Sequence, residues 1–312
     1  MTFAEPTENP RPERCCLELA RSQLGLIARR QALELGLSRH AVQQRVSSGA
    51  WRRVHEGVFA VGAADGGWRG DVMAACLAAG GNAVASHRAA AVLWRFDGIV
   101  RAPVEITVPH GEEASLRGVV AHRSRLLDDL DRRRIGPIPV TIPERTLIDF
   151  ARSEGEVSVE KALESALRER VTTEAAAWRY IEERGKGLPG ARRLRRILLE
   201  RTPGKPAGSG GEVELLRCLR LAGVPTPVRQ YELRLPNGRG AVLDLAWPDR
   251  RVGAEWDGYD VHGGRRAHAD DLERQNGILA LGWTLRRYTG SRVRRDPRGI
   301  TAEIVAALLA AA

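Results

Sequence analysis

The sequence predicts an α/β multidomain protein, and three observations lead to that class. The first sixty residues contain the pattern of three short helices followed by a hairpin. The middle mixes helices with short alternating strands, and a Pro/Gly/Ser-rich stretch at 202–211 precedes a last third of helix, hairpin, helix and strand. At about 100–200 residues per domain, the 312 residues predict domains at 1–62, 63–201 and 207–312.

The N-terminal segment contains residues that typically begin or end helices, and these residues lie close together in the sequence. Helices are predicted at 14–23 and 28–35, and Gly36 ends the second. Ser38 is suited to cap a third helix at 39–48, which leaves only a tight turn between the last two helices. The alternating run 51–61, centred on Gly57, is typical of a two-stranded wing. The segment is therefore predicted to be a winged helix-turn-helix.

The third helix has a polar outer face. Val42 and Val46 lie four residues apart and should pack inward. Arginine, histidine and glutamine left outside can pair with base edges in the major groove of double-stranded DNA, and wing arginines can meet phosphates. The net charge of +10 favours a polyanionic partner. The predicted DNA-binding residues are Arg39, His40, Gln43, Gln44, Arg52 and Arg53.

The stretch GLIARRQALELGLSRHAVQQRVSSGAWRRVHEGVFAVG resembles the N-terminal winged helix of AbiEi-type antitoxins and related regulators, over about residues 20–62. Two later pieces, AVASHRAAAVLW and VTIPERTLIDFA, are similar to segments downstream of it in that family. The resemblance implies a transcriptional regulator, with a toxin as partner if it is antitoxin-like. The alternative is a helix-turn-helix that makes only protein contacts.

The middle segment is predicted to be a mixed α+β domain. Strands are expected at 104–108 and 118–122, and amphipathic helices at 160–170 and 191–201. Ser86 and His87 are not expected to act as nucleophile and base, because neighbouring residues of a helix point apart. Instead, satisfied polar contacts are expected for His87, Arg88, Arg145 and Asp149.

The C-terminal third contains a predicted hairpin at 241–258. A symmetric loop around 248–251 pairs residues whose numbers sum to 499, so that Asp244 lies opposite Glu255. The alternation of side chains then assigns two faces. The apolar face is predicted to hold Leu243, Leu245, Trp247, Val252, Ala254 and Trp256, and the other face Val242, Asp244, Ala246, Gly253, Glu255 and Asp257.

Three carboxylates on one strand face need compensating positive charge. Oxygen ligands of this type suit Mg²⁺ (or Mn²⁺), which could activate water and neutralise a scissile phosphate. Glu212, on the inward face of a helix at 212–221, could join Asp244, Glu255 and Asp257 as a ligand. The competing interpretation makes Glu212 part of a capping box that begins at Ser209.

The ordered pattern SGGE, DLAWPDRRVGAEWDG, H and DLERQNGILALGWTLRRYT, over about 207–290, resembles a small domain family allied to very-short-patch repair endonucleases. The resemblance implies a restriction-endonuclease-like PD-(D/E)xK core. Asp244 and Glu255 would then be metal ligands, Glu212 the helix acid, and His262 the family histidine. The lysine that the wider superfamily places at 257 is aspartate here.

Two functions follow from these patterns. The first is a metal-dependent endonuclease that hydrolyses DNA phosphodiester bonds, with His262 or Arg274 contacting phosphate or water. The second is an AbiEi-like transcriptional regulator or antitoxin with an inert nuclease fold. Carboxylates that converge on a cation favour the enzyme, whereas carboxylates bound by arginines favour the regulator. An RNA substrate, the target sequence and the oligomeric state are left open.

Localisation is predicted from what the sequence lacks. No segment reaches the ~18 uncharged apolar residues of a membrane helix, and residues 1–14 have no apolar core of a signal peptide. The four cysteines have no metal-binding spacing and are expected to be reduced thiols. A cytoplasmic protein without a membrane partner is therefore expected.

Overall fold

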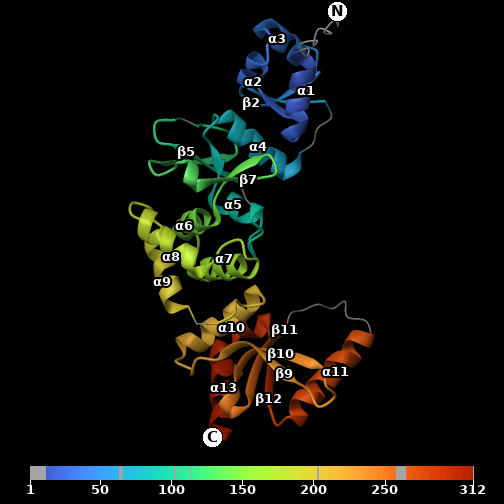
Figure 1. Cartoon of the computed structure of the whole chain (residues 1–312), viewed down its shortest axis with the longest axis vertical. Coiled ribbons are helices and arrows are strands. Elements are labelled where there is room, and N and C mark those ends of the chain that lie inside the picture. Colours follow the sequence, from blue (N-terminus) through green and yellow to red (C-terminus); the bar gives the residue numbers. More distant parts are fainter. Residues whose placement is uncertain are drawn as a thin grey trace, which may run out of the picture. The chain divides into compact units, whose positions relative to one another are not determined.

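The structure is a computed structural model that describes residues 12–62, 66–101, 103–112, 114–201, 204–257 and 265–311, with only the backbone at 265–268. It contains two compact units (Figure 1). The N-terminal unit comprises Met1–Arg95, Ile99–Ser153 and Tyr180–Ala191; the C-terminal unit comprises Phe96–Gly98, Glu154–Arg179 and Arg192–Ala312. None of the described helices is long and apolar enough to cross a membrane.

The N-terminal unit begins with three helices and a three-stranded sheet of order β1-β3-β2. The predicted local signals hold: Gly36 ends the second helix with φ +96°, and the Ser38 hydroxyl accepts the Ala41 N–H at 3.1 Å. Val42 is buried, as predicted, and packs with Trp51 and Phe59. The elements are α1 (Pro12–Ser22), β1 (Leu26–Ala28), α2 (Arg29–Glu34), α3 (Arg39–Ser47), β2 (Trp51–His55) and β3 (Val58–Val61).

The same unit continues into a five-stranded mixed sheet of order β6-β5-β4-β8-β7. Helix α4 packs on this sheet through an apolar face of small residues. The two predicted strands are present, and the shorter β4, β7 and β8 join them. The elements are α4 (Gly67–Ala78), β4 (Val84–Ala85), α5 (His87–Leu93), β5 (Val104–Pro109), β6 (Val119–Ser124), η1 (Asp129–Asp131), β7 (Arg132–Ile135), β8 (Ile138–Thr141) and α6 (Pro143–Ser153).

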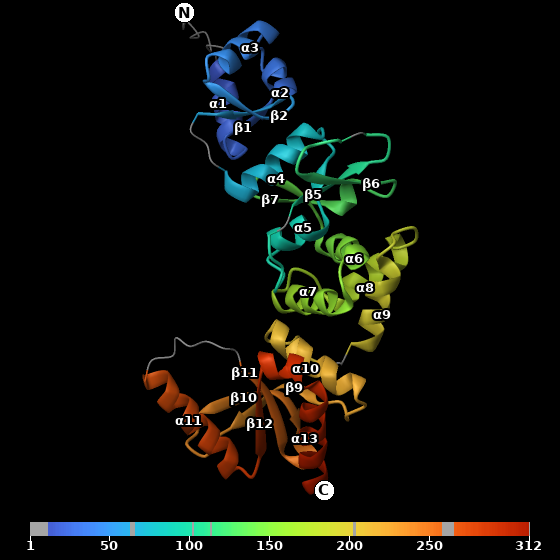
Figure 2. The ribbon, with the colours of Figure 1, turned by 180° about the vertical axis from the view of Figure 1, so that it is seen from behind.

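The C-terminal unit has a four-stranded sheet of order β12-β11-β10-β9, in which only β11 and β12 are parallel. Helices α10 and α13 cover one face and α11 covers the other (Figures 1 and 2). Its elements are α7 (Glu156–Arg168), α9 (Ala191–Glu200), α10 (Gly210–Leu221), β9 (Val228–Arg234), β10 (Gly240–Trp247), η2 (Pro248–Arg250), β11 (Val252–Asp257), α11 (Arg265–Ala280), β12 (Thr284–Thr289), α12 (Gly290–Arg295) and α13 (Pro297–Ala310); α8 (Glu174–Arg184) is divided between the units.

The compact units divide the chain differently from the three predicted domains. Helix α7 lies before the predicted boundary, yet it belongs to the C-terminal unit. Its buried Glu164 binds Arg229 of β9 at 2.5 Å and Arg201 at 2.8 Å, and accepts the N–H of Ala207 at 2.9 Å. The end of the Pro/Gly/Ser-rich stretch is therefore fixed against a helix that precedes it in the sequence.

The predicted hairpin register is present, but the predicted apolar face is wrong at Leu243, which lies on the opposite side of the sheet from Leu245. Leu245 pairs with Ala254 and Trp247 with Val252, so the paired numbers sum to 499. Leu243, however, packs with the core beneath α11, whereas Leu245 packs with α10 and α13. The alternation breaks at Asp244, opposite which Gln230 has a left-handed backbone with φ +49°. Helix α11 therefore covers an apolar face of its own, beside the carboxylates.

Candidate functional sites

The outer face of α3 is the first candidate site. Its four predicted DNA-binding residues are all exposed, as are Arg52 and Arg53 of β2. No described carboxylate lies within ion-pair distance of Arg39, Arg52 or Arg53. A hollow beside α3 is lined by Arg29, Leu33, Arg39, His40, Val42 and Gln43.

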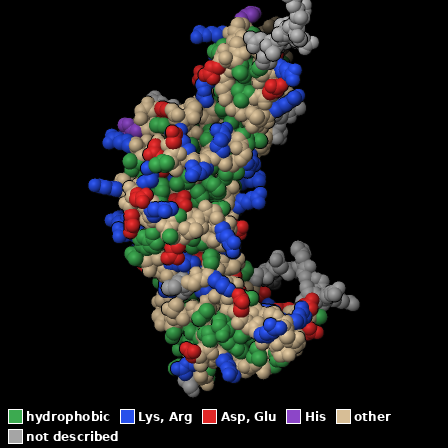
Figure 3. Space-filling model, in the orientation of Figure 1, with side chains coloured by type: hydrophobic (Ala, Val, Ile, Leu, Met, Phe, Trp, Pro, Cys, Tyr) green, Lys and Arg blue, Asp and Glu red, His purple; other side chains and the backbone are tan. Residues whose placement is uncertain are grey.

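Arg39, Arg52 and Arg53 have no carboxylate partner among the described residues, and they lie close to the exposed glutamines of α3. On the face shown in Figure 3, basic and acidic side chains are interspersed over much of the molecule. Arg14 of α1 and Arg45 of α3 already bind Glu18 and Glu13, each at 2.9 Å. Free guanidinium groups beside exposed glutamines can bind phosphates without first giving up a carboxylate.

The second candidate site is the carboxylate face of the hairpin. Glu255 is 6% exposed, and both of its oxygens accept hydrogen bonds from Arg274 of α11. Arg287 of β12 lies 3.8 Å from Glu255 and 3.3 Å from Asp257. Trp256 points to the opposite face and packs with the core of α10 and α13, as predicted. Two guanidinium groups therefore neutralise the two carboxylates at the end of β11.

Asp244 and Glu212 form a separate acidic pair around Gln230. The Gln230 amide donates to Glu212 at 2.8 Å and approaches Asp244 at 3.4 Å, and the Trp256 N–H donates to Asp244 at 2.9 Å. Burial, and then the charge of Glu212, raises the pKa of Asp244 to about 6. Burial also raises the pKa of Glu212. Among the described residues, neither Asp244 nor Glu212 forms an ion pair like that between Glu255 and Arg274.

Only half of the predicted capping box is present. The Ser209 hydroxyl accepts the Glu212 N–H at 3.2 Å and caps α10, whereas the Glu212 carboxylate accepts the N–H of Gly208 at 2.7 Å. The same carboxylate is 7% exposed and faces Asp244 through Gln230. One side chain therefore fixes the chain just before the helix and contributes charge to the acidic pair.

The four carboxylates do not fit an Mg²⁺ or Mn²⁺ site in this arrangement. Among the described residues, Asp244, Glu212, Glu255 and Asp257 do not supply three ligand atoms close enough to share one ion. Arg274, predicted to contact phosphate or water, is engaged by Glu255. His262 lies outside the described residues.

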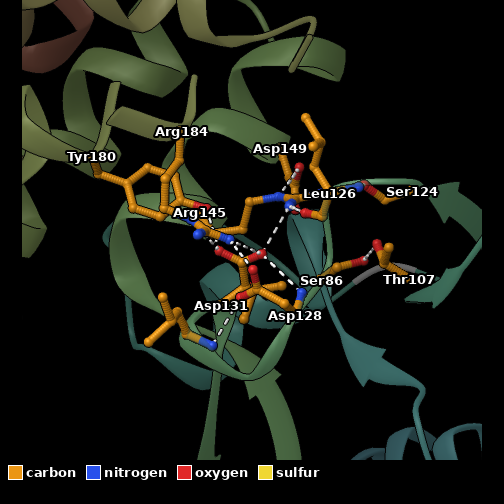
Figure 4. Close-up of polar contacts among 12 residues, drawn as sticks. Ser86, Thr107, Ser124, Leu126, Asp128, Asp131, Arg145, Asp149, Tyr180 and Arg184 are labelled. Carbon is orange, nitrogen blue, oxygen red and sulfur yellow. Dashed lines mark hydrogen bonds and ion pairs between the residues drawn. The ribbon is translucent and has the colours of Figure 1, made fainter. Parts of the chain in front are cut away.

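The third candidate site lies in the middle of the N-terminal unit. Arg145 of α6 is 2% exposed, binds Asp149 at 2.9 and 3.0 Å, and donates to the Ser124 hydroxyl at 3.1 Å (Figure 4). Asp131, fully buried, lies 3.6 Å from Arg145 and accepts a hydrogen bond from the Tyr180 hydroxyl. The expected satisfied contacts of Arg145 and Asp149 are thus present.

The prediction that Ser86 and His87 point apart is wrong. Helix α5 begins at His87, so Ser86 precedes it with an extended backbone. The Ser86 hydroxyl lies 3.0 Å from His87 Nδ1 and accepts a hydrogen bond from Thr107 at 2.7 Å. The expectation of satisfied contacts also fails for His87, because its buried Nε2 has no hydrogen-bond partner. A cavity of about 450 Å³ adjoins His87, Thr107 and Arg145.

Comparison with known proteins gives a family for the first segment. Residues 17–62 match the family described as transcriptional regulator, AbiEi antitoxin. The chain is also 29% identical over 273 residues to two uncharacterized proteins of Mycobacterium tuberculosis, one from strain CDC 1551 and one from strain H37Rv; each match covers 86% of this chain and 96% of the relative. A solved structure from M. tuberculosis, the RV2827C protein, matches with a TM-score of 0.39 and 15% identity, over 72% of this chain and 88% of that one. The α3 region thus lies in a segment similar to transcriptional regulators of the AbiEi antitoxin family.

Proposed function

We propose that the protein is a transcriptional regulator of the AbiEi antitoxin type, which binds double-stranded DNA through α3 and the β2–β3 hairpin as a winged helix-turn-helix. The observation that carries the proposal is the exposed polar face of α3, whose Arg39 has no carboxylate partner among the described residues, within the segment that matches that family. A toxin is the partner that this family suggests.

The proposal gives different tasks to different residues. Gln43 and Gln44 project from α3, where glutamine can form a bidentate pair with adenine, and Arg39 can pair with guanine. Arg52 and Arg53 project from β2 and suit phosphate contacts, which set the position of α3 on the duplex. Burial of Val42 and Trp51 fixes the helix and the strand against each other. The site is thus built on rigid elements.

The test is a salt titration of the full chain on a duplex selected from a random-sequence pool. Each phosphate contact adds about −0.9 to the slope of log K against log salt. We expect Arg52→Gln and Arg53→Gln each to reduce the slope by about one, while Gln44→Ala weakens the selected duplex by about 1–3 kcal/mol relative to an unselected one. Arg14→Gln, whose arginine already binds Glu18, is the matched control. An unchanged slope in both wing variants would refute the proposal.

The endonuclease interpretation is weaker, because arginines occupy the carboxylates at the end of β11. This proposal treats the C-terminal unit as an inert relative of nucleases. Incubation of the full chain with plasmid and Mg²⁺ or Mn²⁺ should therefore give no cleavage beyond that of a chelator control. Chelator-sensitive cleavage that disappears in Glu255→Ala would contradict this and restore the enzyme.

A further inference from the structure

A cluster of two histidines and one glutamate lies outside the proposed DNA-binding surface. His87 begins α5, Glu105 lies on β5 and His122 on β6. One side-chain ligand atom from each lies within 4.8 Å of the others. Strands β5 and β6 are hydrogen-bonded neighbours, and the Ser86 N–H donates to the Glu105 carbonyl at 3.1 Å. Three consecutive parts of one sheet therefore hold the three side chains together.

The imidazole groups of His87 and His122 stack and do not share a hydrogen bond, so one ring must turn before both Nε2 lone pairs point at one ion. The rings of His87 and His122 stack with centroids 3.6 Å apart and an angle of 17°. Both Nε2 atoms are buried without a hydrogen-bond partner. A buried polar atom without a partner costs about 1–3 kcal/mol, so two of them side by side need an explanation. A cation between the two lone pairs would satisfy both.

Contacts around His87 favour the protonation state that an ion requires. With the proton on Nδ1, the His87 ring donates to the Ser86 hydroxyl at 3.0 Å, which leaves the Nε2 lone pair available. Thr107 donates to the same hydroxyl at 2.7 Å and fixes its position.

The backbone at His87 carries strain. Its φ is +49°, a left-handed conformation that non-glycine residues adopt at a cost of order 1–3 kcal/mol. At 3% exposure, the ring is held within the sheet rather than turned to solvent. Strain of this kind is frequent at ligand sites, where the surrounding structure maintains it.

We propose that His87, Glu105 and His122 bind a divalent transition-metal ion of the zinc class, with a fourth position open to the adjoining cavity. Imidazole nitrogen and carboxylate oxygen are ligands that zinc accepts at about 2.0–2.2 Å. Tetrahedral bonds of that length place ligand atoms about 3.4 Å apart. His122 Nε2 and Glu105 Oε2 are already 3.5 Å apart, and the ligand atoms of the cluster all lie within 4.8 Å of one another. Glu105 and His122, with 17% and 21% of their side chains exposed, have room to turn toward one ion.

The cavity indicates what would occupy the open position. It has a volume of about 450 Å³ and is lined by Arg123, Arg125, Arg145 and Arg152, with Asp149 as the one acidic residue of the lining. Arg145 is engaged by Asp149, but the balance of the lining is cationic. Water, hydroxide or a small anion is therefore the fourth ligand that this site would take. The site is independent of the proposed DNA-binding surface.

Zinc titration by calorimetry tests the site, with tag-free, full-length protein freed of metal by chelation. We expect one tight equivalent of Zn²⁺. Glu105→Gln and His122→Gln should each weaken binding more than 100-fold. Ser86→Ala, which removes the contact to the ligand histidine and the acceptor of the Thr107 hydroxyl, should weaken it about 10–100-fold. His110→Gln, an exposed histidine directly after β5, is the matched control and should bind like the unaltered protein.

Cobalt substitution identifies the ligands independently. Co²⁺ bound by nitrogen and oxygen gives visible bands without the thiolate-to-metal charge transfer that cysteine ligands produce. Circular dichroism of each variant confirms that it is folded, and Glu105→Gln preserves the shape of the side chain. Three results would each overturn the proposal: no bound equivalent of Zn²⁺, a zinc affinity of Glu105→Gln and His122→Gln equal to that of the unaltered protein, or a thiolate-to-metal band in the cobalt spectrum.

Discussion

The acidic pair in the C-terminal unit makes a prediction with a defined pH dependence. Asp244 has a pKa of about 6, raised by burial and by Glu212. Relative to its ordinary value of 3.8, this difference corresponds to about 3 kcal/mol at about 1.36 kcal/mol per pKa unit. Because the side chain is only partly buried, we discount this to about 1–2 kcal/mol of destabilisation by the charged form.

The sign follows from the direction of the shift. A carboxyl group whose pKa is raised in the folded state contributes stability below its unfolded pKa, and loses that contribution as the pH rises through the folded value. Asp244 therefore favours folding near pH 4 and opposes it above about pH 6. Asp244→Asn keeps an oxygen that can accept the Trp256 N–H but removes the charge.

We expect Asp244→Asn to raise the free energy of unfolding by about 1–2 kcal/mol at pH 7.5, with the gain disappearing near pH 4. Urea unfolding of both proteins at the two pH values, with equal m-values, measures the difference. Asp249→Asn, at the exposed turn of the same hairpin, should change stability by less than about 0.5 kcal/mol. Equal or lower stability of Asp244→Asn at pH 7.5 would refute the reasoning.

Two further predictions concern the N-terminal unit. Arg145→Met leaves buried Asp149 without its guanidinium partner and leaves Asp131 with Arg184 alone, so unfolding should become about 3–5 kcal/mol easier, as measured by urea denaturation. Gly190→Ala places a Cβ 1.8 Å from the carbonyl oxygen of Ile148, so the two segments must separate; we expect the melting temperature to fall by several degrees in a thermal scan.

Matched controls separate these effects from general sensitivity. Arg133 lies in exposed β7, and its guanidinium donates only to a neighbouring carbonyl, so Arg133→Met should be nearly neutral. Gly155 has open space around its Cβ position and an ordinary φ of −68°, so Gly155→Ala should be neutral. If Arg133→Met lost as much unfolding free energy as Arg145→Met, the loss could not be assigned to the buried ion pairs. If Gly155→Ala lowered the melting temperature as much as Gly190→Ala, the effect could not be assigned to the clash with Ile148.

The sequence predicted best what local signals determine. The cap at Ser38, the glycine end at Gly36 and the alternation around Gly57 depend on neighbouring residues, and the corresponding elements are present. The register of the C-terminal hairpin, in which Leu245 pairs with Ala254, was likewise predictable from the position of its turn. The short strands β1 and β4 escaped prediction because two or three residues carry no period, and their partners lie far along the chain.

The candidate sites also divide into those set by neighbouring residues, which were predictable, and those set by contacts between distant residues, which were not. Exposed residues on α3 were predictable because a helix period separates Val42 from its polar neighbours. The histidine cluster was not, because His87, Glu105 and His122 are 17 or 18 residues apart and meet only through the pairing of β5 with β6. One signal was present: the pair Ser86-His87 precedes an alanine-rich helix. It was misread because His87 was placed inside that helix rather than at its strained first position.

The choice between metal and arginine at the carboxylate face determines how the C-terminal unit is interpreted. A divalent ion must be acquired from solution, and its affinity falls when its ligands are protonated. Guanidinium groups stay charged at every pH at which the protein is folded, so Arg274 and Arg287 neutralise Glu255 and Asp257 permanently. Cleavage would require these contacts to break before an ion could enter, at the cost of two buried or half-buried ion pairs. The proposed regulator, which binds DNA without cleaving it, has no such requirement, and in that proposal the C-terminal unit serves as a scaffold whose carboxylates are held by Arg274 and Arg287.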